Sequence, residues 1–345
     1  MPANGKPRPS IQDVARLAGV SLGTVSNVLN SPDRVKDATI AKVSRAIDQL
    51  GFVRNDAARQ LKAGKSKTIG LIVLDASNPF FGELARGAED AAHDLNYSVL
   101  LGNSGHDGDR EGQYVSLFEE QRVGGVLISP VGEISEVVAN LRTHGTQTVL
   151  VDRKADASLC CSVSVDDVAG GRIAVEHLIG QGFKKIAFVG GPLNIQQVAD
   201  RLLGAKEAVR ASKQGATLKV LKSRNMNVLA GREVGEALLL EKRESWPDAI
   251  FAANDLLAVG LVQAFMFKAK VRIPEDIAVI GYDDIDFAEA AVVPLSSVKQ
   301  PAGLLGSTAI EMLVDEIDNP IRHKHRQITF QPELVIREST ASKIR

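Results

Sequence analysis

Apolar residues in the first fifty positions recur at the spacing of short amphipathic helices. Three stretches, residues 11–18, 22–29 and 37–50, each place their apolar side chains on one helical face. Gly19 follows the first stretch and Gly51 the third, and glycine is the residue most common just past a helix end. The pattern predicts two short helices joined by a tight turn and braced by a third.

The polar residues around the second predicted helix give this unit a candidate role. Ser10 is positioned to cap the first helix, with Asp13 completing a capping box, and Ser21 to cap the second. Such a helix-turn-helix unit can present the start of its second helix to base edges of DNA. The residues outside the apolar face of that helix are Leu22, Gly23, Thr24, Ser26 and Asn27. For Ser21, Thr24 and Ser26, the pattern is compatible with both capping and phosphate bonding.

Residues 55–63 form a short stretch with helical preference after this unit. Isolated helices of about 12–15 residues are already marginal in water, so we expect this shorter stretch to order only when two copies pair on DNA. Leu61 is an isolated large apolar residue among Arg59, Lys62 and other basic residues. It is either buried against the core or inserted between base pairs of the minor groove, with the basic residues on phosphates.

After Lys67 the pattern changes to apolar strands that alternate with amphipathic helices. Residues 68–74 form a strand of the kind that is buried on both faces of a parallel sheet. The other predicted strands are Tyr97–Leu101, Gly125–Ser129, Thr146–Val151, Lys185–Gly190, Thr217–Leu221, Asp248–Ala252 and Ile277–Tyr282. This rhythm predicts an α/β fold with parallel sheets, and the length favours two lobes, which we divide near residue 162.

Polar and aromatic residues gather where these predicted strands end, which is where ligands bind in open parallel sheets. Aromatic faces with carboxylate, amide and guanidinium groups suit a polyhydroxylated ligand. Taken singly, Asn78, Asn254 and Asp283 also fit helix caps. Phe80, Phe81 and Phe251 also fit a hydrophobic core. The candidate ligand-binding residues are Asn78, Phe80, Phe81, Asp152, Arg153, Arg201, Phe251, Asn254, Asp283 and Gln300.

Composition and charge narrow the class of protein. Apolar residues make up 44% of the chain and charged residues 24%, as in ordinary globular proteins, and no apolar run reaches the ~18–20 residues of a membrane span. The N-terminus lacks a secretory signal pattern, and the adjacent Cys160 and Cys161 indicate free thiols, so we expect a cytoplasmic protein. Residues 1–67 carry a net charge of +7 and the remainder −8, which favours contact of the first part with a polyanion.

Signatures of catalysis and cofactor binding fail on inspection. Residues 64–66 resemble the end of a phosphate-binding loop, but Arg59 stands where its first glycine belongs. Lys185 interrupts a dinucleotide-type glycine pattern, and His106 interrupts a nucleophile-elbow pattern. The six His and two Cys lack metal-ligand spacing. We interpret His323 and His325 as part of a solvated face. We therefore expect no enzyme activity, no cofactor and no metal.

The first sixty-two residues also carry a specific resemblance. Residues 11–30 resemble the headpiece of the lactose/galactose repressor family, and residues 53–62 resemble its hinge helix. The resemblance implies that Leu22, Gly23 and Asn27 occupy base-reading positions, although Gly23 has no side chain to read with. It favours the minor-groove role for Leu61. The implied DNA-binding residues are Ser21, Leu22, Gly23, Thr24, Ser26, Asn27, Asn30, Arg59, Leu61 and Lys62.

The same resemblance implies the organisation of the whole chain. It predicts a headpiece over 1–54, a hinge over 55–67, and a two-lobed periplasmic-binding-protein-like core over 68–345 for effector binding and dimerisation, with three crossovers between lobes. The expected bounds are about 68–161 and 297–325 for lobe one, and about 162–296 and 326–340 for lobe two. The polar set at the strand ends is similar to that of ribose-binding members.

Pattern and resemblance lead to one functional hypothesis with an alternative. We expect a homodimeric repressor that binds a pseudo-palindromic operator and is controlled by a sugar, with a preference for a pentose such as ribose. The alternative is a repressor that uses a nucleobase or a phosphorylated metabolite as corepressor. A transport binding protein would fit the core alone but not the basic headpiece, and a sugar-modifying enzyme would need catalytic motifs that the sequence lacks.

Overall fold

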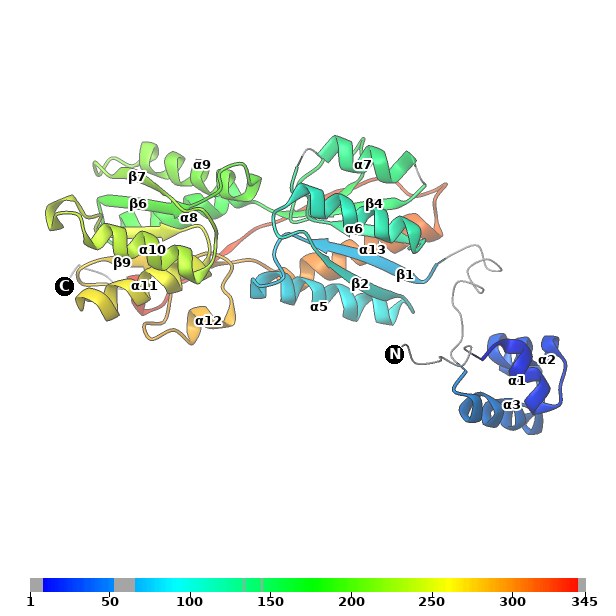
Figure 1. Cartoon of the computed structure of the whole chain (residues 1–345). Helices are drawn as coiled ribbons and strands as arrows, with labels where there is room; N and C mark the ends of the chain where they lie inside the picture. The colour runs from blue at the N-terminus through cyan, green and yellow to red at the C-terminus, as the bar shows by residue number, and fades with distance from the viewer. Residues whose placement is uncertain (1–8, 53–65, 133, 144, 341–345) are drawn as a thin grey trace. The chain divides into compact units, whose positions relative to one another are not determined.

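The chain forms two compact units, Met1–Lys65 and Ser66–Arg345, seen in the computed structural model of Figure 1. The structure describes residues 9–52, 66–132, 134–143 and 145–340. Most of the hinge, including Arg59, Leu61 and Lys62, lies outside the described residues. Within the described part, no helix has the length and apolar character needed to cross a membrane.

The first unit is the three-helix bundle that the apolar spacing predicts. Its elements are α1 (Ile11–Ala18), α2 (Leu22–Asn30), the 3₁₀ helix η1 (Pro32–Arg34) and α3 (Asp37–Leu50). Ser10 and Asp13 form the predicted capping box, and Gly19 ends α1 in a left-handed conformation with φ of 64°. The buried apolar side chains come from all three α-helices: Val14, Ala15, Val25, Val28, Val43 and Ala46.

Lobe one of the second unit is built on a parallel sheet with the strand order β11-β5-β4-β3-β1-β2 among the described residues. Its strands are β1 (Thr68–Val73), β2 (Ser98–Asn103), β3 (Gly125–Ile128), β4 (Gln147–Val151), β5 (Cys161–Val165) and β11 (Gln327–Phe330). Helices α5 (Pro79–Asp94) and α13 (Ala302–Asp318) pack on one face of the sheet. Helices α6 (Gly108–Glu120) and α7 (Ile134–Thr143) pack on the other.

Lobe two repeats this architecture around a smaller parallel sheet in the order β7-β6-β8-β9. Its strands are β6 (Lys185–Gly190), β7 (Thr217–Lys222), β8 (Ala249–Ala252) and β9 (Ala278–Ile280). Its long helices are α8 (Asp167–Gly180), α9 (Gln196–Ala211), α10 (Val228–Leu239) and α11 (Asp255–Ala269), and they pack as the pairs α8–α9 and α10–α11. The shorter elements are η2 (Arg243–Ser245), α12 (Asp286–Glu289), β10 (Ser297–Lys299), β12 (Glu333–Val335) and η3 (Glu338–Thr340).

The described chain passes between the lobes at three places, as the resemblance implies. It leaves lobe one between β5 and α8, returns between β10 and α13, and leaves again between β11 and β12 (Figure 1). β10 pairs antiparallel with β12, and an isolated bridge joins Ser296 to Ile280 of β9, so both short strands extend lobe two. The predicted α/β core with parallel sheets is confirmed.

The lobe boundaries differ from the sequence prediction at three strands. The prediction gave residues 162–165 and 327–330 to lobe two and 297–299 to lobe one, but β5 and β11 belong to the sheet of lobe one and β10 lies in lobe two. The pattern missed β5 because its serines read as surface residues. In the fold they are buried, and the Ser162 hydroxyl accepts a hydrogen bond from the backbone N–H of Ala155.

Candidate functional site

The first residues of α2 are exposed on the surface of the first unit. The Ser21 side chain accepts a hydrogen bond from the Thr24 backbone N–H, as the capping prediction requires, and its hydroxyl lies 2.8 Å from that of Thr24. Leu22 is 46% exposed, and Gly23 and Asn27 are exposed beside it. The positions that the resemblance assigns to base reading therefore face solvent, as a DNA-contacting surface must.

Hydrogen bonds join Asn30, the last residue of α2, to Ser26 in the middle of the same helix. The Asn30 side-chain amide donates to the Ser26 backbone oxygen at 2.7 Å and to the Ser26 hydroxyl at 3.2 Å. These bonds fix the two polar side chains on one side of the helix, while Val25 and Val28 pack into the core on the other. A phosphate contact by either residue would have to share these groups.

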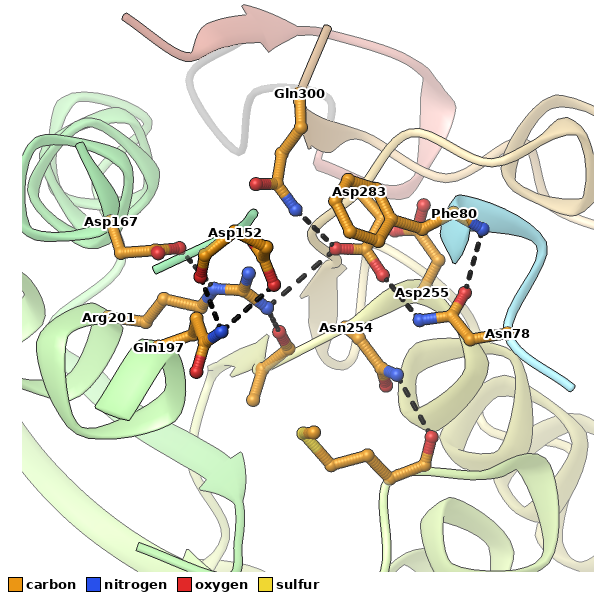
Figure 2. A network of polar contacts seen from close by, with 12 residues as sticks. Asn78, Phe80, Asp152, Asp167, Gln197, Arg201, Asn254, Asp255, Asp283 and Gln300 are labelled. Carbon is orange, nitrogen blue, oxygen red and sulfur yellow. Dashed lines mark hydrogen bonds and ion pairs between the residues drawn. The ribbon is translucent and has the colours of Figure 1, made fainter. Parts of the chain in front are cut away.

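The second unit has a polar cleft where the carboxyl ends of strands from both lobes meet (Figure 2). The predicted residues that line it are Asn78, Phe80, Phe81 and Asp152 from lobe one, and Arg201, Asn254 and Asp283 from lobe two. The centre of a water molecule can reach only about 30 Å³ of the cleft, which is room for about two waters. The lobes are therefore close together, and their polar side chains bond to one another.

Asp283, which follows β9, is the centre of one hydrogen-bonded group. Its Oδ2 accepts from the Asn78 amide at 3.0 Å, and its Oδ1 accepts from the Gln300 amide at 2.8 Å. Arg201 Nη1 lies 3.7 Å from the same Oδ1 (Figure 2). Burial raises the pKa of Asp283, and Arg201 together with the two amides opposes that rise. The Asn78–Asp283 bond links lobe one to lobe two.

Arg201 is held by contacts with lobe two on three parts of its guanidinium group: Nε, Nη1 and the flat face. Nε donates to Asp167 Oδ1 at 2.7 Å, Nη1 donates to the Ala253 backbone oxygen at 2.7 Å, and the group stacks 3.7 Å from the Tyr282 ring centroid. α8 and α9 come close enough for the Asp167 bond because Gly171 faces the backbone of Arg201, where a Cβ would lie 2.0 Å from the carbonyl oxygen. Arg201 thus holds a fixed charge at the cleft wall.

Asp152, at the end of β4, forms a second link between the lobes. Gln197 of α9 donates to its carboxylate at 2.9 Å and to its backbone oxygen at 2.6 Å. Burial, reinforced by the charge of Asp167, raises the pKa of Asp152 to about 8. Its backbone has a φ of 58°, an uncommon conformation for a residue other than glycine that recurs at functional sites.

Unpaired polar atoms mark the same cleft. Among the described residues, Asp152 Oδ1, Gln197 Oε1 and Gln300 Oε1 are buried side-chain oxygens without a hydrogen-bond partner. Asp152 and Gln197 line the cleft, whereas Gln300 lies behind Asp283. Buried polar atoms are almost always paired, so the two unpaired oxygens in the cleft wall indicate a place where a donor from a ligand or water binds. Phe80 and Phe81 add an edge-to-face aromatic pair, with ring centroids 5.0 Å apart.

Asn78 and Asn254 both cap a helix and lie in the cleft wall. Asn78 caps α5 through its Oδ1, which accepts from the Phe80 backbone N–H at 3.1 Å, while its amide bonds to Asp283. Asn254 caps α11 through its Oδ1 at 3.0 Å from the Leu257 backbone nitrogen, and its amide donates to the Met226 backbone oxygen. Each cap thus fixes an amide at the cleft wall.

Three predicted residues do not line the cleft. Phe251 is fully buried in the core of lobe two, against Phe188 and Tyr282, because it points from the middle of β8. Arg153 is partly exposed beyond Asp152 and takes no part in the cleft wall. Gln300 lies behind Asp283 and reaches the cleft only through that carboxylate.

The structure adds residues that the sequence analysis missed. Gln197 lies one helical turn before Arg201 in α9, and this four-residue spacing was the signal that could have found it. Asp167 was missed because β5, the strand that precedes it, was not predicted. His106 lines the cleft from lobe one, with its Nδ1 buried and without a hydrogen-bond partner among the described residues.

Comparisons with known families match both parts of the chain. Residues 10–55 match the model described as bacterial regulatory proteins, lacI family. Residues 175–340 match the model described as a periplasmic binding protein-like domain. A helix-turn-helix headpiece joined to a two-lobed ligand-binding core defines the class as a DNA-binding regulator.

Relatives along the full length make the assignment specific. The chain is 34% identical to the HTH-type transcriptional repressor PurR of Vibrio atlanticus, over 96% of this chain and 98% of the relative. It is 33% identical to the ribose operon repressor of Escherichia coli K12, over 96% and 99%. The chain belongs to the lacI family of bacterial regulatory proteins, whose members are DNA-binding repressors with small-molecule effectors.

Solved structures agree with this assignment. The lac repressor dimer bound to operator and the anti-inducer ONPF superimposes with a TM-score of 0.79 at 25% identity, over 97% of this chain and 99% of that one. A lacI-family regulator from Enterococcus faecium with bound ribose gives a TM-score of 0.71 at 29% identity, over 81% and 100%.

Proposed function

We propose that this protein is a homodimeric repressor that binds a pseudo-palindromic operator in the cytoplasm and is controlled by a sugar, preferentially a free pentose such as ribose, in the cleft between its lobes. The observation that carries the proposal is the charged pair of Arg201 and Asp283 at the cleft wall, surrounded by amide groups. The relatives named above include a ribose operon repressor and a regulator with bound ribose.

The chemistry of the cleft suits a small molecule with several hydroxyl groups. A carboxylate can accept hydrogen bonds from two neighbouring hydroxyl groups, and a guanidinium donates hydrogen bonds to hydroxyl oxygens in a fixed plane. Asp152 and Asp283 supply carboxyl groups on opposite lobes, and Arg201 lies beside them. Phe80 and Phe81 supply apolar surface for the carbon side of a sugar ring.

The tight fit of the lobes explains how ligand binding would act at a distance. A sugar is larger than the roughly two waters that the cleft admits, so it has to move the lobes or replace the bonds Asn78–Asp283 and Gln197–Asp152. We infer that a change in lobe angle alters the spacing of the two paired hinge segments and thus their ordering on DNA. Couplings of this kind are typically about 1–3 kcal/mol.

An apolar surface on lobe two supports the dimer. Phe267 at the end of α11 is 71% exposed, and Phe287 of α12 and Val292 are also exposed. Between α11 and α12 they border a groove in which the centre of a water molecule can reach about 410 Å³. We propose that a second copy of the chain covers this surface, because two headpieces match the two half-sites of a pseudo-palindromic operator.

The same proposal assigns the DNA contacts. Leu22, Gly23 and Asn27 face base edges of the major groove, and the hydroxyls of Ser21, Thr24 and Ser26 with the Asn30 amide bond to phosphates. In the hinge, Leu61 enters the minor groove and Arg59 and Lys62 bind the adjacent phosphates. Sequence selection from random duplexes would provide the operator for all binding measurements.

The decisive experiment is a thermal-stability panel followed by operator titration. A ligand that binds only the folded protein raises the melting temperature, so pentoses, hexoses, nucleosides, purines and sugar phosphates are compared with the purified chain. We expect a free pentose to raise the melting temperature and to weaken operator binding. A response confined to purines or phosphorylated compounds, with tighter operator binding, would replace the sugar by a corepressor.

A further inference from the structure

The strongest unassigned feature is a cluster of potential metal ligands at the opposite end of the lobe one sheet from the cleft. Cys161 is the first residue of β5, Glu316 belongs to α13, and His323 lies in the connection from α13 to β11. The sequence pattern favours a solvated face for His323. That interpretation is wrong, because the His323 side chain is only 2% exposed and is packed against Cys161.

The distances within this cluster fit a single ion. Cys161 Sγ lies 3.2 Å from His323 Nε2, and Glu316 Oε2 lies 3.9 Å from the same nitrogen. The three ligand atoms all lie within 4.8 Å of one another. Ligand atoms ~2.0–2.3 Å from a tetrahedral zinc ion are ~3.3–3.6 Å apart, so small side-chain shifts would complete the geometry.

Supporting groups around the cluster point the same way. Asp315 Oδ2 accepts from His323 Nδ1 at 2.7 Å, which leaves Nε2 with the lone pair that a metal needs. The backbone N–H of Arg326 donates to Cys161 Sγ at 3.3 Å. Among the described residues, Glu316 Oε2 is a buried oxygen with no hydrogen-bond partner, although it faces His323. An ion would satisfy that atom.

Cys161, His323 and Asp315 are also linked in the order of a catalytic Cys-His-Asp triad. The structure disfavours that alternative. Cys161 is completely buried, so no substrate could reach its sulfur. A metal ion is small enough to enter, and its two charges would balance a thiolate and a carboxylate.

We propose that Cys161, Glu316 and His323 bind one transition-metal ion of the zinc class, with Asp315 orienting the His323 ring and solvent in the fourth position. The ion joins β5, α13 and the connection from α13 to β11, and so stabilises the last return of the chain through lobe one. Sulfur and nitrogen ligands select zinc-class ions over magnesium and calcium, which prefer oxygen. The site is separate from the cleft, so this proposal does not depend on the proposed effector.

The test is titration of the full, untagged, reduced and metal-free protein with Co²⁺ and then Zn²⁺. We expect one Co²⁺ per chain, tetrahedral absorption bands in the visible and a sulfur-to-cobalt charge-transfer band in the near ultraviolet, all displaced by Zn²⁺. Zn²⁺ should also raise the melting temperature. Cys161→Ser should abolish the charge-transfer band. His323→Ala should abolish the rise in melting temperature with Zn²⁺.

The chain offers a matched control in the adjacent thiol. Cys160 is as buried as Cys161 but is not part of the cluster, so Cys160→Ser should bind Co²⁺ with an unchanged spectrum. Asp315→Asn keeps all three ligands and should weaken Zn²⁺ binding by about 10–100-fold. Circular dichroism of each variant shows whether it has folded, and Asp315→Asn provides the answer if Cys161→Ser does not fold.

Three outcomes would overturn the proposal. The first is the absence of a charge-transfer band in the wild-type protein with Co²⁺. The second is a band that survives Cys161→Ser or disappears in Cys160→Ser. The third is selective alkylation of Cys161 over Cys160 by iodoacetamide at neutral pH, undiminished by Zn²⁺, which would favour the triad instead.

Discussion

The headpiece exposes the side chains that are proposed to bind DNA, whereas the core buries the side chains that line its cleft. Leu22 is 46% exposed, but Arg201 and Asp283 are only 4% and 6% exposed. Exposed charges are screened by salt within about 10 Å at 0.1 M, and buried charges are screened much less. One chain can therefore place two recognition sites under different control. Salt would act at the DNA surface, whereas pH and the pairing of polar groups would act in the cleft.

The largest expected effect is a loss of folding stability when a buried charge in the core is removed, compared with an exposed charge in the same core. Arg201→Ala would leave Asp167 and Asp283 buried without their common cation, so we expect the free energy of unfolding to fall by about 3–5 kcal/mol. Arg172 makes a comparable bond, 2.8 Å, to Glu207, but both side chains are more than a third exposed. Arg172→Ala should therefore cost only about 0–1 kcal/mol.

Urea denaturation of the two variants measures this contrast. Arg201→Met combined with Asp167→Asn should recover part of the loss, because it removes one of the stranded carboxylates along with the cation. Equal destabilisation by Arg201→Ala and Arg172→Ala would contradict the view that burial sets the strength of the cleft pairs.

A smaller change tests the pairing pattern without removing bulk. Asp283→Asn turns one acceptor oxygen into a donor that faces the donor amide of Asn78 or Gln300. We expect effector affinity to fall by about 10–100-fold, the range for lost hydrogen bonds to charged groups. Effector affinity and operator affinity should both stay unchanged in Asp286→Asn, an exposed neighbour in α12. Calorimetry showing normal ligand binding by Asp283→Asn would refute the cleft assignment.

On the DNA side, apolar and charged contacts should be separable by salt. Leu61→Ala removes the proposed wedge, and we expect operator affinity to fall by about 1.5–3 kcal/mol, the cost of one buried leucine, with the same salt dependence. Lys62→Ala should instead reduce the slope of log affinity against log salt by about one. Effector affinity should be intact in both. Operator titrations in which Leu61→Ala binds like the wild type would rule out the wedge.

How far sequence predicts structure also differs between the two regions. The headpiece was predictable almost to the residue because its signals are local: apolar spacing fixes the helices, and Ser10, Gly19 and Gly51 fix their ends. In the core, strands with apolar runs were found, but β5 was not. Its buried serines satisfy their hydroxyls with tertiary partners that lie up to 165 residues away, and no local pattern records such a partner.

The cleft shows the same limit at the level of single residues. Asn78, Asp152 and Asp283 were chosen because they follow predicted strands, and all three line the cleft because parallel strands bring their carboxyl ends to one edge. Phe251 was misassigned because a strand pattern alone does not say at which point the side chains leave the core. The partner of Cys161, His323, is separated from it by 162 residues, and only the sheet order brings them together.

The remaining expected effect is the pH response of the cleft. Burial holds the Asp152 pKa near 8, well above its unfolded value of about 3.9, so the folded protein keeps a proton that the unfolded chain has lost. The stability from that proton is complete below the unfolded pKa and is lost as pH rises through about 8. The charged groups that set this pKa are Asp167, Arg201 and Asp283.

Effector binding should depend on pH in the opposite direction. A hydroxyl donates best to an ionised Asp152, so a sugar has to displace the proton, and its affinity should rise by up to about tenfold per pH unit below 8 and level off above it. Asp152→Asn carries no such proton, and its affinity should be flat over the same range. Calorimetry in buffers of different ionisation enthalpy would detect the released proton.

Operator binding by the effector-free protein uses the exposed headpiece, so it should show the salt dependence of phosphate contacts but no step near pH 8. A wild-type effector affinity that is flat from pH 6 to 9 would mean that the ligand binds the protonated carboxyl group, as a hydrogen-bond acceptor rather than a donor.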